Sequence, residues 1–326
     1  PPQKAAFFGC FLSGYLVHLY VFTNIIPNSD GLSRIFDPQQ MTVSGRWFLH
    51  FASYFNGFTQ MPAVIGLFSV LFLALAAALA VSLLGIRSRA LSALSGALMA
   101  AFPAVGYTFL YLFTASAYCF AIFLAVLSVS LARRGRWHWL AGCLLLACSM
   151  GTYQAYVTVA IGLSLLVIFR ETLDPSASFS ATLRLGVRLM LFLAAGAVLY
   201  YGILLVFLQV KDLELLSYLG MDAASSGYPF SRLPGLLLDT YKQVAAFFFL
   251  PGSANTFTSG WMAVLDLAAL ALGGGCFLLC MGQEGLWRAR WRPLGGLAML
   301  ALLPLGINFG QILSPWSAPT PLMKYA

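Results

Sequence analysis

The chain has 326 residues, of which 60% are hydrophobic and 9% are charged, and its formal net charge is +8. Soluble globular proteins carry about 25% charged residues, so this composition excludes an ordinary soluble domain. Apolar runs long enough to cross a bilayer recur along the whole sequence. The runs are continuous rather than alternating, which argues against a β-barrel. We therefore expect an all-α polytopic membrane protein.

The positive charge does not indicate a nucleic-acid partner. The basic residues form short clusters between apolar runs, as the positive-inside rule produces, and no basic stripe is interleaved with aromatic residues. The six cysteines all lie within apolar runs. Their spacing matches neither a disulfide framework nor a metal site, so we interpret them as small buried hydrophobic residues.

In chain order the apolar runs predict nine or more spans, with basic loops on the cytoplasmic side. An outer loop at 28–60 separates the first span from the second, and a longer outer loop covers 211–259. Pro103 and Gly106 predict a kink in the third span. The nine predicted spans are 5–26, 61–85, 91–109, 113–131, a short one from 139 to the polar residues 151–154, 156–169, 189–210, 261–281 and 294–313.

Three further segments shape the expected architecture. Residues 47–60 predict either a short helix in the membrane interface or the start of the second span. In the long outer loop, LSYLGM and LPGLLLDTYKQVAAFFFLP have amphipathic patterns. Inside the span 261–281, Gly273 to Gly275 predict close helix packing. Residues 1–326 are expected to form a single transmembrane domain. Because the sequence stops at the edge of another apolar segment, we expect a fragment that lacks C-terminal helices.

The most informative stretch is the polar segment Asn28 to Arg46, which holds Asp30, Arg34 and Asp37 between two apolar runs. A carboxylate at the membrane surface can take a proton from a hydroxyl group. A neighbouring arginine can pair with a phosphate through its planar fork. Sugar transfer from a lipid phosphate needs this combination, although an ordinary turn or helix cap would use the same residue types.

Four residues elsewhere are candidates for substrate binding. Tyr153 and Gln154 lie near the outer end of two short spans, where polar groups face a cavity or form a plain loop. Lys242, in the long outer loop, could hold a phosphate or face lipid headgroups. Asp266 is the acidic residue within a span, where a functional role and a hydrogen bond between helices are equally consistent with its position.

Three short motifs carry a resemblance to a known family. They are N-x-D-x-x-x-R at 28–34, S-G-R-W at 44–47 and Y-Q-x-Y at 153–156. In this order, after the first span and after a short fifth span, they resemble the glucosyl transferase type II family of bacterial membrane enzymes. That family is similar in architecture to the GT-C glycosyltransferases, so the resemblance implies a GT-C-like helical bundle with interfacial helices at its outer face.

The resemblance also implies a reaction. Asp30 would be the general base, Arg34 and Arg46 would contact phosphate or sugar, and Tyr153 and Gln154 would line the cavity. The donor would be a polyprenyl-phosphate sugar, with glucose the usual sugar, and the acceptor a surface glycan such as the O-antigen of lipopolysaccharide. The transfer would be inverting, at the periplasmic face of the bacterial inner membrane. A donor-synthesising enzyme and a flippase would be functional partners.

Metal dependence stays open, because Asp30 and Asp37 could hold a divalent cation but two carboxylates alone do not define a site. Two other functions are also open. A transporter or flippase of lipid-linked saccharide would carry charges through several spans and broken helices in two repeated halves. A lipid-linked glycan polymerase or ligase would use the long outer loop, although such enzymes favour outer loops rich in arginine and histidine.

Overall fold

The structure is a computed structural model that describes residues 1–26, 28, 38–56, 61–216, 232–251, 259–283 and 285–313. Throughout these ranges all regular structure is helical. The helices are α1 (Pro2–Thr23), α3 (Pro38–Val43), α4 (Leu49–Ala52), η1 (Ser53–Asn56), α5 (Pro62–Leu84), α6 (Arg89–Ala101), α7 (Pro103–Leu110), α8 (Leu112–Ala132), α9 (Arg136–Thr152), η2 (Gln154–Tyr156), α10 (Val157–Thr172), α11 (Phe179–Val210), α12 (Leu233–Phe249), α13 (Gly260–Gln283), η5 (Leu286–Arg288), α14 (Trp291–Ile307) and α15 (Phe309–Leu313).

The expected all-α membrane architecture is confirmed, but the count of nine spans is not. Among the described residues, six helices are long and apolar enough to cross a membrane, or seven if α6 and α7 form one bent span. The helices α9 and α14 have only 17 residues each. At 1.5 Å per residue such a helix covers about 25 Å, less than the roughly 30 Å thickness of a bilayer core.

The kink predicted near Pro103 is confirmed. The helices α6 and α7 are separated at Phe102, and their axes differ by 41°. Phe102 has extended backbone angles, and Pro103 begins the next helix. A proline disfavours helical geometry in the residue before it and is well accommodated in the first turn of a helix.

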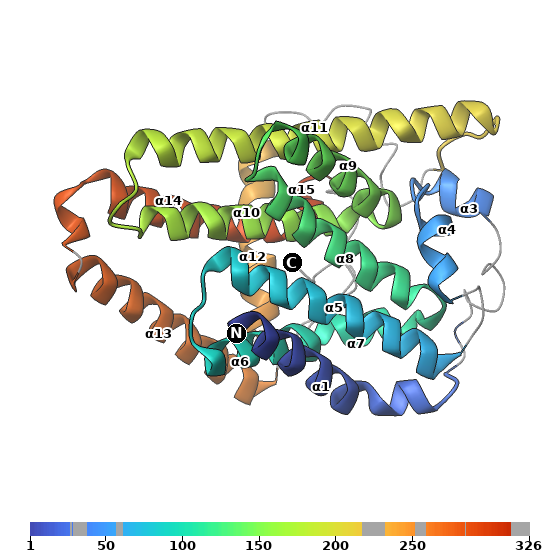
Figure 1. Cartoon of the computed structure of the whole chain (residues 1–326), viewed down its shortest axis with the longest axis horizontal. Helices are drawn as coiled ribbons and strands as arrows, with labels where there is room; N and C mark the ends of the chain where they lie inside the picture. Colours follow the sequence, from blue (N-terminus) through green and yellow to red (C-terminus); the bar gives the residue numbers. More distant parts are fainter. Residues whose placement is uncertain are drawn as a thin grey trace.

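The long helices run roughly side by side (Figure 1). Helix α1 packs on α5 and α6, and the series continues from α5 to α8, from α8 to α9 and from α9 to α11. Helix α10 packs on α14, and α13 contacts α12. The largest core cluster is richest in residues of α5 and α8, extends to α1, α7, α9, α10 and α11, and combines many alanines with Phe, Leu and Tyr.

Small residues allow the closest helix contact. A Cβ atom on Gly96 of α6 would lie 2.1 Å from the carbonyl oxygen of Ala6, and one on Gly9 of α1 would lie 2.3 Å from that of Ala93. Such close approach between backbones is typical of membrane helices. The close packing expected at Gly273 to Gly275 is wrong for the part of the chain that the structure describes, because no described atom lies within 4 Å of the Cβ positions there.

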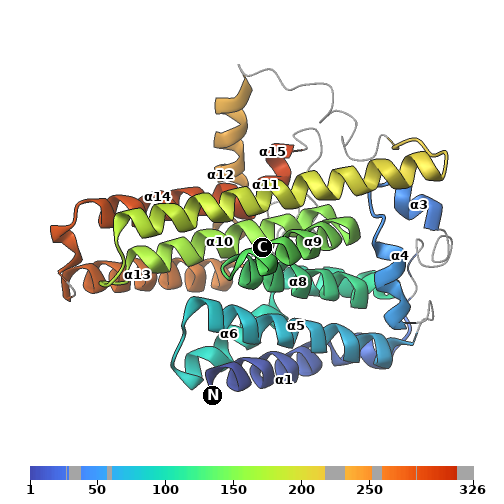
Figure 2. The same cartoon turned by 45° about the horizontal axis from the view of Figure 1, so that its top comes forward.

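The two outer-loop segments contain helices of their own. Residues 49–56 form α4 and η1, separate from α5, so this segment is not the beginning of the second span. The amphipathic stretch near residue 240 is confirmed as α12, which crosses the direction of the long helices in both views (Figures 1 and 2). The other amphipathic stretch, after Leu216, lies outside the described residues.

The bundle has two chemically different ends. We call the end formed by the connections 85–88, 133–135, 173–178 and 285–290 the basic end, because these connections hold or adjoin most of the predicted cytoplasmic arginines. We call the end that carries α3, α4, η2 and the last turns of α11 the Arg46 end. Figure 1 shows the basic end toward the left and the Arg46 end toward the right.

Candidate functional site

The predicted catalytic stretch is only partly described. Asp30, Arg34 and Asp37 lie outside the described residues, so their roles stay predictions. Asn28, at the start of this stretch, donates a hydrogen bond from Nδ2 to the carbonyl oxygen of Leu110 over 3.2 Å. The described chain resumes with α3, whose C-terminal end leads into the S-G-R-W motif.

The S-G-R-W motif forms the C-terminal cap of α3. Gly45 has φ of 78°, and its N–H donates to the carbonyl oxygen of Thr42 over 2.9 Å. The N–H of Arg46 donates to the carbonyl oxygen of Met41 over 2.8 Å. These two bonds, with a left-handed glycine between them, make the Schellman motif. The glycine therefore ends the helix and determines where the next residue, Arg46, projects.

Trp47 and Phe48 attach this segment to the end of α9. The N–H of Phe48 donates to the carbonyl oxygen of Gly151 over 2.7 Å. The Trp47 ring lies against Gly151, where a Cβ atom would come within 2.6 Å of it, and stacks on Phe207 of α11 at 5.7 Å between centroids. Trp47 is buried. The aromatic pair and the glycine therefore hold the motif between α9 and α11.

Gln154 and Tyr200 secure the same segment through its backbone. The Nε2 of Gln154 donates to the carbonyl oxygen of Ser44 over 2.8 Å and to the hydroxyl of Tyr200 over 3.1 Å. The Tyr200 hydroxyl donates to the carbonyl oxygen of Gly45 over 3.0 Å. Two motifs that are about a hundred residues apart in the sequence are thus joined by direct hydrogen bonds.

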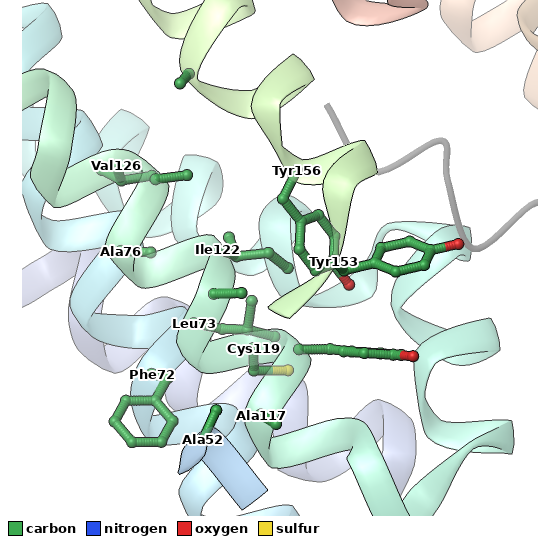
Figure 3. Packing of buried hydrophobic residues seen from close by; sticks show 14 of the residues in the cluster. Ala52, Phe72, Leu73, Ala76, Ala117, Cys119, Ile122, Val126, Tyr153 and Tyr156 are labelled. Atoms are coloured by element: carbon green, nitrogen blue, oxygen red, sulfur yellow. The ribbon is translucent and has the colours of Figure 1, made fainter. Parts of the chain in front are cut away.

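Arg46 lies against a group of tyrosines. Its guanidinium carbon is 4.9 Å from the ring centroid of Tyr153, and Nη1 donates to the hydroxyl of Tyr118 over 3.4 Å. The rings of Tyr118 and Tyr153 are 5.0 Å apart, and Tyr156 contacts both. The three tyrosines are buried, whereas Arg46 is half-buried. Figure 3 shows Tyr153 and Tyr156 beside Cys119 and Ile122 of α8.

This arrangement forms the candidate site, which we call the Arg46 site: Arg46 with Tyr118, Tyr153, Gln154 and Tyr200. A cation on an aromatic face is stabilised by about 0.5–1 kcal/mol when exposed and by about 2 kcal/mol when desolvated. The aromatic contact engages the flat face of the guanidinium group, whereas anions bind along its N–H edges. The geometry is therefore compatible with binding an anion edge-on.

A sequence model of the glucosyl transferase GtrII family matches residues 19–307. The match includes the S-G-R-W motif, the Y-Q-x-Y motif and every helix of the Arg46 site. The chain belongs to the glucosyl transferase GtrII family. No curated protein and no solved structure matches the chain significantly. The resemblance read from the sequence is confirmed.

Membership in the GtrII family, together with the apolar helices, makes the chain a membrane glycosyltransferase. Sugar donor and glycan acceptor are the substrate classes that a glycosyltransferase requires. The family match does not depend on the placement of any one residue, so it leaves the individual roles of Asp30, Arg34 and Asp37 as predictions.

The structure of this GtrII-family chain does not bring Lys242 or Asp266 to the Arg46 site. Lys242 lies on α12 and forms an exposed ion pair with Asp239, 3.3 Å away and three residues earlier on the same helix. Asp266 lies on α13, which packs against α12 and η5. Both views show α13 well apart from α3 and α4 (Figures 1 and 2).

Sequence reasoning missed two residues of the Arg46 site and one nearby cation. Tyr118 and Tyr200 lie within long apolar helices, and a buried tyrosine usually places its hydroxyl against a partner. This tendency of buried tyrosines is the signal by which the sequence could have identified Tyr118 and Tyr200. Lys211, at the end of α11, donates to Oγ1 of Thr42 over 3.3 Å, and its Nζ lies 5.6 Å from the ring of Phe207. It brings a second positive charge to the Arg46 end.

Among the described residues no group of three or more His, Cys, Asp or Glu side chains could hold a metal ion. Asp30 and Asp37, the two carboxylates considered for a divalent cation, lie outside those residues. Whether this pair binds a cation therefore stays a prediction.

Proposed function

We propose that this chain transfers a glucosyl group from a polyprenyl-phosphate donor to a surface glycan at the Arg46 end of the bundle. The supporting observation is the direct contact between the S-G-R-W and Y-Q-x-Y motifs, which surrounds one arginine with tyrosines. A reaction that expels a phosphate needs a cation at this kind of position, in a largely apolar setting where its charge is poorly screened.

In this proposal Arg46 binds the phosphate of the donor. Transfer breaks the bond between the anomeric carbon and the phosphate oxygen, and negative charge increases on the departing polyprenyl phosphate. The guanidinium group stabilises that charge through its N–H groups. Tyr153 and Tyr118 support its orientation through the ring face and the phenol, so little reorganisation is required during transfer.

Asp30 is the proposed general base. Its carboxylate takes the proton from the acceptor hydroxyl, and the hydroxyl oxygen forms the new bond at the anomeric carbon as the phosphate leaves on the opposite side. A single displacement of this kind inverts the anomeric configuration. Asp30 is two positions after Asn28, whose side chain is bound to the end of α7, and Arg34 and Asp37 follow in the same stretch as further substrate contacts.

The positive-inside rule would place the basic end in the cytoplasm and the Arg46 end outside the inner membrane of a bacterium. The donor would then be made by a separate enzyme on the cytoplasmic side and moved across by a flippase. The O-antigen of lipopolysaccharide is the proposed acceptor.

The test is glucosyl transfer in membranes containing Asp30→Asn, with synthetic polyprenyl-phosphate glucose as donor and matched protein levels. Because general-base catalysis contributes about 10²–10⁴-fold, we expect transfer to fall by at least about 100-fold. Asp174→Asn is the matched control, since Asp174 is half-buried at the basic end, away from the Arg46 site, and asparagine can still accept its two hydrogen bonds from Ser176. Near-normal transfer by Asp30→Asn would show that Asp30 is not the base.

A further inference from the structure

A groove at the basic end carries positive charge beside apolar surface. It has a volume of about 630 Å³ and lies between α9 and α11. Arg136, Arg184 and Arg188 are among its lining residues, and among the described residues that line it none is acidic. Arg136 and Arg184 are exposed, while Arg188 is half-buried. The Arg46 site does not use this groove, since α3 and the last turns of α11 lie at the other end of the bundle (Figure 1).

The arginines of the groove differ in what they already bind. Arg188 donates from Nε to the carbonyl oxygen of Ala132 over 2.7 Å and from Nη2 to that of Arg134. Within the described residues, Arg184 donates from Nε to the carbonyl oxygen of Ser180 over 3.2 Å. Arg136 lies 5.9 Å from the ring of Trp137. The side chains of Arg136 and Arg184 therefore place net positive charge at the solvent-facing rim of the groove.

The rest of the groove is apolar and follows one face of α11. Leu183, Val187 and Leu191 recur every four residues and remain 55%, 43% and 54% exposed. From Arg184 to Leu191 the helix rises by about 10 Å, so the apolar stripe extends from the charged rim toward the middle of the bundle. Trp139 lies at the same level as the rim and donates from Nε1 to the carbonyl oxygen of Arg188 over 3.4 Å.

We propose that this groove binds an anionic phospholipid. The phosphate pairs with Arg136 and Arg184, and one acyl chain lies along Leu183, Val187 and Leu191. Charge complementarity supports this occupant, because a basic pocket between membrane helices suits an anionic headgroup and the apolar stripe suits a hydrocarbon chain. Tryptophan at the rim matches the depth of the membrane interface. The groove is thus a lipid site separate from the proposed transfer reaction.

The experiment is native mass spectrometry of the full chain in detergent, titrated with phosphatidylglycerol or with phosphatidylcholine of the same acyl chains. Each arginine near an anionic headgroup contributes about fivefold in affinity, so Arg136→Gln with Arg184→Gln should weaken phosphatidylglycerol binding by about 25-fold. The matched control is Arg87→Gln with Arg89→Gln, which removes two exposed arginines from another connection of the same end. The control should bind phosphatidylglycerol as the unmodified protein does.

A second variant tests the apolar part. Val187→Asn places a neutral polar amide in the apolar stripe and keeps all three arginines, so it should also weaken phosphatidylglycerol binding while the protein elutes and melts as the unmodified protein does. Equal binding of phosphatidylcholine, equal loss in the Arg87 and Arg89 control, or binding of glycerol phosphate without chains would each overturn the proposal. If native mass spectrometry instead gives the mass of a dimer for the unmodified protein and of a monomer for the Arg136 and Arg184 variant, the occupant of the groove is a second copy of the chain.

Discussion

Arginine side chains at the basic end and at the Arg46 end are held by different kinds of partner. At the basic end Arg170 donates to the carbonyl oxygen of Leu83, at the end of α5, over 3.0 Å. Arg188 binds carbonyl oxygens at the end of α8, and Arg292 binds those at the end of α10. Each of these three arginines comes from a different helix than the one whose end it caps.

The arginines at the basic end bind helix ends because the carbonyl groups in the last turn of a helix have no partners within that helix. These groups carry partial negative charge, so a guanidinium group satisfies both their hydrogen bonds and the helix dipole. Arginines that follow the positive-inside pattern therefore also act as tertiary caps in this chain. At the other end, Arg46 contacts an aromatic ring face and a phenol hydroxyl.

The comparison predicts that substitutions at the two ends have separable effects. Loss of a capping arginine should mainly lower stability, because main-chain carbonyls lose their donors. Loss of Arg46 should mainly lower transfer, because its contacts with Tyr153 and Tyr118 hold a positive charge in place for the proposed reaction. The experiments below test that separation, beginning with the largest expected effect.

Arg46→Gln should reduce glucosyl transfer by about 100- to 1000-fold, the usual cost of removing one group that stabilises transition-state charge. We expect its melting temperature to fall less than that of Arg292→Gln, which loses hydrogen bonds to four main-chain carbonyl oxygens. Transfer and thermal unfolding would be measured on the same purified protein. Arg87→Gln, an exposed arginine at the basic end, is the control. A large loss of stability with unchanged transfer in Arg46→Gln would reverse the assignment.

Arg292→Gln should give the largest loss of stability. Arg292 is only 6% exposed and donates to the carbonyl oxygens of Thr172, Asp174, Pro175 and Ala177. Hydrogen bonds from charged groups contribute about 1.5–3 kcal/mol each, and they are not additive, so we expect a loss of at least about 3 kcal/mol.

The measurement for Arg292 is unfolding in detergent monitored by intrinsic fluorescence. Arg292→Lys keeps the charge but has fewer donors, so its stability should lie between those of the unmodified protein and Arg292→Gln. If both variants unfold like the unmodified protein, the connection between α10 and α11 does not depend on this cap.

Tyr200→Phe should have a smaller effect on both properties. It removes the hydroxyl that accepts from Gln154 and donates to the carbonyl oxygen of Gly45, which costs about 1–2 kcal/mol of stability. We also expect a reduced affinity for donor, read as a raised KM, because the segment that carries Arg46 loses one of its attachments. Tyr201→Phe, at the exposed neighbouring residue, should leave both measurements unchanged.

Asp174 should give the smallest effect, and that effect should depend on pH. Its carboxylate accepts hydrogen bonds from the N–H and the hydroxyl of Ser176, which lower the pKa of Asp174 below its ordinary value of 3.8. The contribution is therefore present above pH 3.8 and is lost as the pH falls through the folded-state pKa. Asp174→Ala should be slightly less stable near neutral pH, and the difference should vanish in acid unfolding curves.

Local sequence patterns predicted much of the fold. Continuous apolar runs predicted helices that the structure confirms, and Pro103 predicted the break at Phe102 because the effect of proline on its neighbour is local. The span count was less predictable, since α9 and α14 are short and apolar composition alone does not separate a full span from a partial one. Gly273 to Gly275 misled for a related reason, because small residues permit close packing without requiring it.

For the candidate site, the sequence indicated the two motifs but not how they meet. Arg46, Tyr153 and Gln154 were identified as candidates, whereas Tyr118 and Tyr200 were not. Lys242 was selected as a cation in the long outer loop and Asp266 as an acidic residue within a span, yet they lie on α12 and α13, away from the Arg46 site. Arg46 and Tyr118 are separated by 72 positions in the sequence, and Gly45 and Tyr200 by 155. Such contacts depend on helix packing, which no local pattern specifies.

The sequence by itself determined the membrane class, most of the helices, the break at Phe102 and the glucosyl transferase family, because each follows from composition, local backbone preference or short motifs. Only the tertiary structure decided that Gly45 aims Arg46 at a group of tyrosines, and that three arginines cap the ends of neighbouring helices. The reason is physical. Helix formation satisfies the chain's own hydrogen bonds locally, whereas caps and side-chain contacts depend on which helices become neighbours.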